Sequence, residues 1–242
     1  MTASLSLPLQ DTRAQLGLLG AFSLSIDARS VRIPMNAQRL VGFLALNEGL
    51  LLRQHVAGSL WGDVTDPRAA GSLRSALWRL GSSPHPLVEV VDPHMRLSPT
   101  VAVDVRASES LAYRILDESQ DLDEIDLDES LLAHDLLPDW TEDWVLIKRE
   151  HHTQLRLRAL EALCRRLAQM GRFGQAVQVG MLAVAGEPLR ESAQRALMAA
   201  HIAEGNTAAA VAQFKAFQQL MQDELGLDPS PDLQGMIEEA NR

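Results

Sequence analysis

The sequence of 242 residues contains a single cysteine, Cys164. One thiol cannot form an internal disulfide, nor a zinc site without further ligands, so the sequence predicts neither. Cys164 falls at helical spacing among Leu160, Leu163 and Leu167, which is typical of a residue inside a core. We therefore expect a buried, unreactive thiol.

Long apolar runs are also missing. The longest stretches without a charged side chain, residues 14–26 and 173–186, are shorter than the roughly 18 to 20 apolar residues that a membrane span needs. In the first stretch, polar Ser23 and Ser25 alternate with apolar neighbours, which favours a strand over the continuous apolar segment of a signal peptide. The sequence thus predicts a cytoplasmic protein with no membrane partner.

Lysine is scarce, and Lys148 and Lys215 stand against a large excess of arginine. A G·C-rich coding sequence can produce this skew, so the abundance of arginine by itself indicates nothing. The net charge of −10 disfavours a polyanionic partner on average, but it is unevenly distributed. Residues 1–106 carry 10 Arg and 8 acidic residues, giving +2, and residues 107–242 therefore carry −12. Two halves of different charge predict two domains with different partners.

The first half predicts strands followed by three helices. Between residues 16 and 33, short apolar runs alternate with Gly and Ser, as in antiparallel strands. Helices are expected at residues 35–48, at residues 53–61 and from Pro67 onward. In the third helix Leu73, Leu77 and Leu80 recur at i, i+4 and i+7, which places them on one stripe that faces a core.

The opposite stripe of the third helix is basic and hydroxylated. Its members are Arg68, Ser72, Ser75 and Arg79, with Arg74 beside them, and no acidic residue interrupts residues 68–83. Guanidinium and hydroxyl groups on a helix of small residues suit phosphates and guanine edges. A solvated helix face is the alternative for such a stripe taken alone.

A hairpin is predicted after the third helix. Two short apolar runs, residues 87–91 and 95–97, are separated by Asp92, Pro93 and His94. Strands, three helices and a terminal hairpin predict a winged helix-turn-helix, whose third helix enters the major groove of DNA while the wing approaches the backbone. Because the wing carries Arg96, we count this residue among the predicted DNA contacts.

An acidic segment without a base, residues 117–129, separates the two halves. Such a run is typical of a solvated surface or a mobile linker. Beyond it, residues 136–167 are strongly helical in pattern, and Trp140 and Trp144 are spaced to lie on one helix face.

The last ninety residues repeat with a period of 34. Gly171 and Gly205 are separated by this period, and so are Ala176 and Ala210. It is the period of tetratricopeptide repeats, in which stacked helix pairs bury one continuous core. Two unrelated helical hairpins with coincident glycines are the alternative.

Several segments resemble one known family. The segments "LGLLGAFSLSI", "SLWGD", "RAAGSLRSALWRL" and "VAVDV" are similar to the OmpR-type winged helix that opens the Streptomyces antibiotic regulatory protein (SARP) family. The segments "LLPDWTEDWV", "GRFGQAVQV", "EPLRESAQRALMAAHIAEGN" and "ELGLDPSPDL" look like the bacterial transcriptional activator domain that follows it in that family. Their order along one chain makes the resemblance specific.

The resemblance implies a mainly α fold with a small α+β part. It implies an N-terminal extension at residues 1–14, a winged helix at 15–106 and a tetratricopeptide-like activator domain at 107–242. It also implies that the third helix reads DNA and that protomers bind direct-repeat sites in pairs, as a homodimer. The turn between the second and third helices, with Asp63, Val64, Thr65 and Asp66, is where such regulators touch RNA polymerase.

Nothing in the sequence predicts an enzyme, a cofactor or a metal site. His151 and His152 are adjacent on a predicted helix and point about a third of a turn apart, so they cannot grip one metal as i, i+4 histidines do. We interpret both as exposed polar residues. The five other histidines are scattered singly.

The leading hypothesis is a sequence-specific transcriptional regulator that binds double-stranded DNA and, as an activator, recruits RNA polymerase. The alternative is a protein-interaction adaptor, in which the repeat domain binds a peptide or small ligand and the winged helix contacts protein. A repressor also remains open, because the sign of regulation depends on where the binding site lies relative to the promoter.

Overall fold

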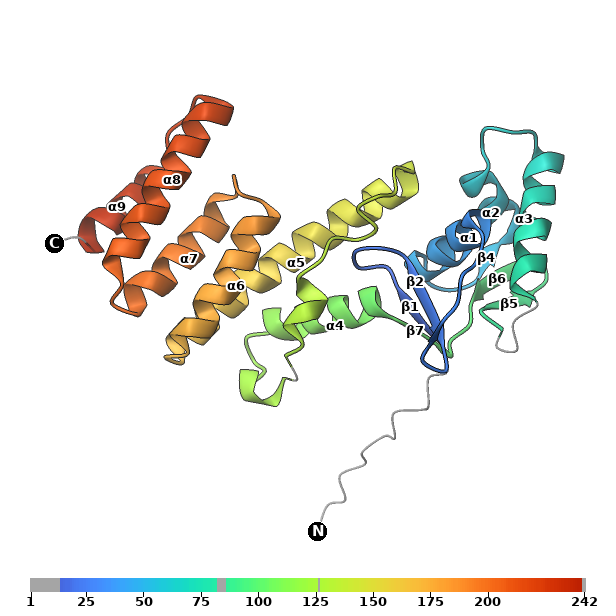
Figure 1. The fold of residues 1–242 in the computed structure, drawn as a ribbon, viewed down its shortest axis with the longest axis horizontal. Coiled ribbons are helices and arrows are strands. Elements are labelled where there is room, and N and C mark those ends of the chain that lie inside the picture. The colour runs from blue at the N-terminus through green and yellow to red at the C-terminus, as the bar shows by residue number, and fades with distance from the viewer. Residues whose placement is uncertain (1–13, 82–85, 126, 241–242) are drawn as a thin grey trace, which may run out of the picture. The chain divides into compact units, whose positions relative to one another are not determined.

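The computed structural model describes residues 14–81, 86–125 and 127–240 (Figure 1). The chain divides into two compact units, the first comprising Met1–Arg106 and Asp135–Glu150 and the second Ala107–His134 and His151–Arg242. The expected N-terminal extension lies outside the described residues except for Ala14.

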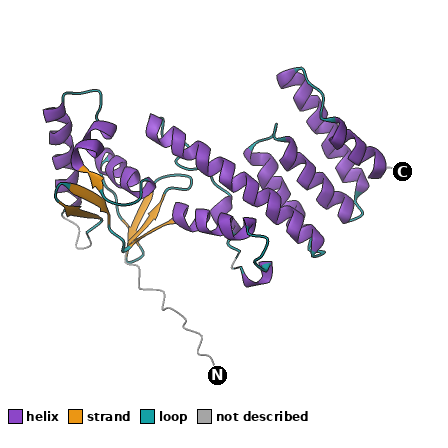
Figure 2. Cartoon of the chain, turned by 180° about the vertical axis from the view of Figure 1, so that it is seen from behind, coloured by secondary structure: helices purple, strands orange, loops and turns teal. Residues whose placement is uncertain are grey.

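The first unit contains two small sheets and three helices. Its elements are β1 (Ala14–Gly17), β2 (Ser23–Ile26), β3 (Arg29–Ser30), α1 (Met35–Leu46), β4 (Leu51–Leu52), α2 (Arg53–Leu60), α3 (Asp66–Leu80), β5 (Val88–Val91), β6 (His94–Leu97) and β7 (Val101–Val103). One sheet has the order β3-β2-β1-β7 and the other β4-β6-β5, and Figure 2 shows their strands in orange. The predicted antiparallel strands, three helices and terminal hairpin are confirmed; the parallel pairing of β1 with β7 was not predicted.

Helix α3 follows from its sequence pattern. Pro67 stands in the first turn, where its missing N–H removes no hydrogen bond. Leu73 and Leu80 are buried, as are the small residues Ala69 and Ala76 between them, while Leu77 is only partly buried. The apolar stripe of α3 thereby fixes the opposite stripe toward solvent.

A later segment, Asp135–Glu150, completes the first unit. The Gly20 N–H donates to the Asp135 carbonyl at 2.7 Å, and the Leu137 N–H donates to the Leu18 carbonyl at 2.9 Å. Residues 136–142, for which a helix was predicted, are instead extended and turn-like. The prediction was wrong because their backbone bonds to the end of β1 and their apolar side chains are buried there.

Two tryptophans anchor this segment on α1. The ring of Trp140 stacks on Phe22 at a centroid distance of 6.0 Å, and the ring of Trp144 meets Phe43 edge-on at 5.2 Å. Both indoles lie over Gly42, where a Cβ would be in van der Waals contact with Trp140 at 3.7 Å and with Trp144 at 3.8 Å. Apolar burial by two indoles is large, so this contact is a main source of stability for the unit.

Arg149 holds the segment in its non-helical path. Its guanidinium donates to the Leu136 carbonyl and the Trp140 carbonyl, each at 2.7 Å, and also to the Leu137 carbonyl. One planar fork of donors thus satisfies three carbonyls that a helix would otherwise have paired. The positive φ of 41° at Leu137 lies inside this braced turn.

Replacing Trp140 by alanine is expected to destabilise the first unit by about 3 to 5 kcal/mol, because a buried indole is exchanged for a cavity. Chemical denaturation followed by circular dichroism measures the change. Trp78→Ala is the matched control, since its indole is 73% exposed and its loss should change stability by no more than about 0.5 kcal/mol. Equal stability of the Trp140→Ala variant and the wild type would contradict the anchoring role.

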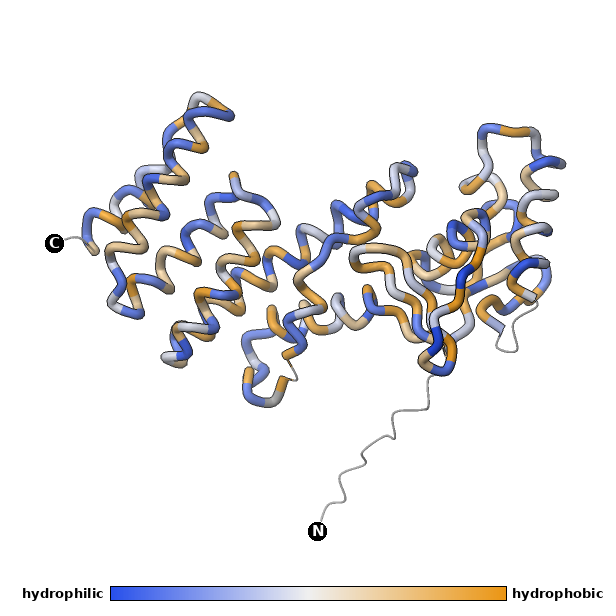
Figure 3. The backbone as a smooth tube through the Cα atoms, in the orientation of Figure 1, coloured by the Kyte–Doolittle hydropathy of each residue, from blue (hydrophilic) through white to orange (hydrophobic). Residues whose placement is uncertain are grey.

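The second unit is helical. Its elements are the main part of α4 (Asp104–Leu116), η1 (Leu122–Glu124), η2 (Glu129–Leu132), most of α5 (Asp143–Gln169), α6 (Phe173–Gly186), α7 (Glu191–Ala203), α8 (Thr207–Leu225) and α9 (Pro231–Ala240). Hydrophobic and hydrophilic residues alternate along its helices (Figure 3), with the apolar ones directed into shared cores.

The 34-residue period corresponds to successive helical hairpins. Gly171 and Gly205 both have left-handed backbones, with φ of 74° and 86°, and each ends the first helix of a pair. Ala176 and Ala210 are fully buried at equivalent places on α6 and α8. The predicted tetratricopeptide-like arrangement is confirmed, and the glycine coincidence has a backbone reason.

The acidic segment is more ordered than a linker. Its described carboxylates are exposed except that of Glu129, which is half-buried, but Leu122 and Ile125 are buried in the core of the second unit. Arg166 braces the stretch by donating to the Ile115 carbonyl at 2.8 Å and to the Gln120 carbonyl. The expectation of a mobile linker overlooked the two apolar residues between the acids.

For two residues of α5, the burial predicted from the sequence can be compared with the structure, and the prediction holds for one of them. Cys164 is fully buried as predicted, and desolvation raises the pKa of its thiol to about 11. His152 was expected to be exposed, but it is 1% exposed and lies 3.1 Å from the Ser108 hydroxyl on α4. The prediction was wrong for His152 because one side of α5 is covered by α4, whereas His151 is exposed.

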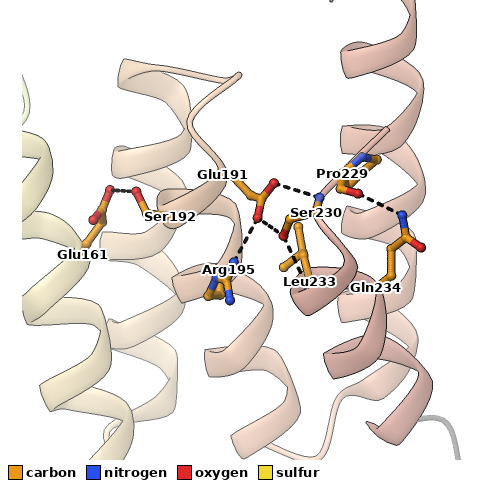
Figure 4. Close-up of polar contacts among 8 residues, drawn as sticks. All are labelled: Glu161, Glu191, Ser192, Arg195, Pro229, Ser230, Leu233 and Gln234. Atoms are coloured by element: carbon orange, nitrogen blue, oxygen red, sulfur yellow. Dashed lines mark hydrogen bonds and ion pairs between the residues drawn. The ribbon is translucent and has the colours of Figure 1, made fainter. Parts of the chain in front are cut away.

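A carboxylate joins the last helix to α7 (Figure 4). Glu191 accepts the Ser230 N–H at 3.0 Å and the Ser230 hydroxyl, and pairs with Arg195 at 2.9 Å. Ser230 precedes α9, and its Oγ accepts the Leu233 N–H at 3.3 Å, as at a helix N-terminus. Partial burial alone would raise the pKa of Glu191, but the Ser230 hydrogen bonds and the Arg195 charge together lower it.

Glu191→Gln is expected to lower the stability of the second unit by about 1 to 2 kcal/mol at neutral pH, because a charge-assisted contact is lost. The pKa of Glu191 is lowered by folding, so its contribution is present above the unfolded-state pKa and disappears as pH falls through the folded-state pKa. Denaturation curves of wild type and variant should therefore converge once the pH has fallen below the lowered folded-state pKa of Glu191. A difference that persists there would contradict this role of the carboxylate.

Candidate nucleic-acid interface

The exposed face of α3 carries most of the predicted contacts. Arg68, Arg74, Ser75 and Arg79 are exposed, and they emerge on the side of the helix opposite Leu73. Asp66, in the first turn, is the acidic residue of this helix, so the face beyond it has cationic and neutral groups. Such a face presents donors for phosphate oxygens and base edges.

Ser72 and Arg96 are less available than the sequence suggested. Ser72 is half-buried at the flank of α3. Arg96 lies opposite Glu89 on the neighbouring strand of the wing, and the two side chains pair at 2.8 Å. This cross-strand pair offsets the charge of Arg96, which makes the wing close to neutral there.

Two residues on this side of the unit, Arg53 and Trp78, were not among the contacts predicted from the sequence. A groove of about 330 Å³ between α2 and α3 is lined by Arg53 and Arg74, with Asp66 at the same groove. Trp78 is 73% exposed, and the Arg79 guanidinium lies 5.2 Å from the centroid of its ring. Helical spacing already placed Trp78 four residues after Arg74, which was the signal that could have revealed it.

The turn between α2 and α3 is exposed in full. Asp63, Val64, Thr65 and Asp66 all face solvent, with Val64 at 37% exposure. Gly62 makes the turn possible, because a Cβ there would meet the Gly58 carbonyl oxygen at 2.8 Å. The turn is therefore a short, protruding surface that begins at a tightly packed glycine.

Comparisons with known proteins bear on the second half of the chain. The family described as "bacterial transcriptional activator domain" matches residues 129–240. Residues 129–240 therefore carry a bacterial transcriptional activator domain. The regulator type predicted from the SARP resemblance is thus confirmed. The matched range starts at Glu129 in the second unit, includes the first unit's later segment Asp135–Glu150 and covers the whole helical repeat.

The fold of the chain is similar to a solved structure. Mycobacterium tuberculosis EmbR, in complex with a low-affinity phosphopeptide, matches with a TM-score of 0.68 at 19% identity. The match covers 95% of this chain and 65% of the EmbR chain, so this chain spans less than two thirds of that protein. At this identity the likeness concerns the fold. No curated protein sequence matches the chain.

The described residues contain neither a helix that could span a membrane nor a cluster of metal-ligating side chains. No helix in the described part of the chain has both the length and the apolar character needed to cross a membrane. Within residues 14–81, 86–125 and 127–240, no three His, Cys, Asp or Glu side chains are grouped as metal ligands would be.

Proposed function

We propose that this regulator binds specific double-stranded DNA in the cytoplasm through α3 and recruits RNA polymerase to promoters as an activator. The observation that carries the proposal is the exposed face of α3, where three arginines stand on a helix whose other side is locked into the core. A rigid helix of this kind fits the major groove, and its arginines can pair with guanine edges or phosphates.

The roles of the contacts follow from their positions. Arg74 and Ser75 lie near the middle of α3 on its exposed face, within reach of base edges for a helix that lies in the major groove. Arg68 and Arg79 lie toward the two ends and are suited to flanking phosphates or bases. Ser72 and Arg96 are secondary contacts, since one is half-buried and the other is paired with Glu89.

The test begins with double-stranded sites selected from a random library by the full chain, followed by fluorescence anisotropy titrations. Arg74→Ala should weaken binding to the selected site by about tenfold or more, because one good base contact is worth about 1 to 3 kcal/mol. Binding should also weaken steeply with salt as counterions are released.

Arg165→Ala is the matched control, because Arg165 is an exposed arginine on α5 in the second unit. It should leave affinity unchanged within about twofold. If the wild type binds selected and random DNA equally well at every salt concentration, the proposed function fails and the adaptor hypothesis gains support.

The α2–α3 turn is the proposed contact with RNA polymerase. Its residues Asp63, Val64, Thr65 and Asp66 are exposed without belonging to the basic face of α3. Two protomers on direct repeats would present this turn twice. Both statements rest on the family resemblance and the exposure of the turn.

Substituting Asp63 and Val64 together by alanine should leave DNA affinity within about twofold and lower promoter-dependent transcription in vitro at least severalfold. Asp66 is kept, because an acid in the first turn of α3 stabilises that helix. Transcription is measured with purified polymerase on the selected site placed upstream of a promoter. Unchanged transcription by the double variant would contradict the assignment of the turn.

A further inference from the structure

Trp78 lies on the exposed face of α3, where its side chain does not pack into the core. Its indole is 73% accessible to solvent, whereas the indoles of Trp61 and Trp140 are 7% and 9% accessible. A large aromatic that remains in water in the free protein is an informative exception, because burying it releases substantial free energy on contact with a partner.

The surroundings of Trp78 are cationic. It follows Arg74 by four residues and Ser75 by three, so all three share the exposed face of α3. The Arg79 guanidinium lies 5.2 Å from the ring centroid, which holds one side of the indole against a charge. The rest of the ring projects among donors of hydrogen bonds.

This combination favours one kind of partner. An apolar protein surface or a lipid interior would have to desolvate the neighbouring guanidinium groups, which costs free energy. Double-stranded DNA instead offers phosphates and base edges to the arginines and an apolar group, the 5-methyl of thymine, in the same major groove. The thymine methyl is the apolar feature that a helix in that groove can reach.

We propose that Trp78 is a specificity-determining residue that packs against the methyl group of a thymine in the target site. The inference rests on the proposed function, since it requires that α3 enters the major groove. It adds a base preference to that function: the site contains a thymine at the position facing the C-terminal half of α3, beside the base or phosphate contacted by Arg74.

The test combines protein and DNA substitutions. Each thymine of the selected site is replaced in turn by deoxyuridine, which removes only the 5-methyl group. For the wild type, one position should weaken binding by about fourfold, the value of one buried methyl-sized group. Trp78→Ala should bind the thymine site at least fivefold more weakly and should no longer distinguish thymine from deoxyuridine at that position.

Two variants control the interpretation. Trp78→Phe keeps an apolar ring and should retain most of the preference for thymine. Thermal unfolding of Trp78→Ala should match that of the wild type, because the side chain is exposed. These measurements separate a lost base contact from a misfolded helix.

The other outcomes overturn the inference in distinguishable ways. If the wild type prefers the selected site but no deoxyuridine changes its affinity, Trp78 does not contact a thymine methyl. If Trp78→Ala binds DNA normally but loses transcription with purified polymerase, the indole contacts protein instead. If the wild type does not prefer the selected site at all, the proposed function fails before Trp78 is tested.

Discussion

The packing of Trp140 and Trp144 against α1 is the contact on which the first unit depends. The chain leaves this unit at Arg106 and re-enters it at Asp135, and the two indoles seal the core that α1 and the four-stranded sheet leave open. Without that closure, α1 would expose Phe43 and Gly42 to water, and α3, which packs against the same core, would lose its support. Helix α3 is therefore positioned in part by residues that lie far beyond it in sequence.

Arginine has two separate tasks in this molecule. Arg149 and Arg166 each turn inward and donate to backbone carbonyls of non-helical segments, and Arg190 pairs with Glu161 at 2.6 Å in the repeat. The arginines of α3 instead project from a helix whose backbone is already satisfied. The planar guanidinium serves both tasks, because its fork of donors fits carbonyl clusters as well as phosphates and guanine edges. This explains why the number of arginines in the sequence indicated little about function, whereas their positions in the sequence indicated much more.

Much of the fold could be predicted from local pattern. The strands could be predicted from alternating apolar residues, and α3 from the helical spacing of Leu73 and Leu80. The helical hairpins could be predicted from the 34-residue spacing of Gly171 and Gly205, which both have left-handed backbones. The path of residues 136–142 could not be predicted, because a helical pattern there is overridden by bonds to Leu18 and Gly20. On α3, the arginine stripe was visible in sequence; the exposure of Trp78 depends on which helix face the core covers.

The return of the chain to the first unit at Asp135 also has a consequence for folding during synthesis on the ribosome. Residues up to 106 emerge first, but the indoles that close their core belong to a segment made after the whole acidic stretch. The core of the first unit therefore stays incompletely packed until Glu150 has been synthesised. By then α4 and the start of α5 have also been synthesised and can contribute to the second unit. The two units share an interleaved folding history, unlike domains that form one after another as they leave the ribosome.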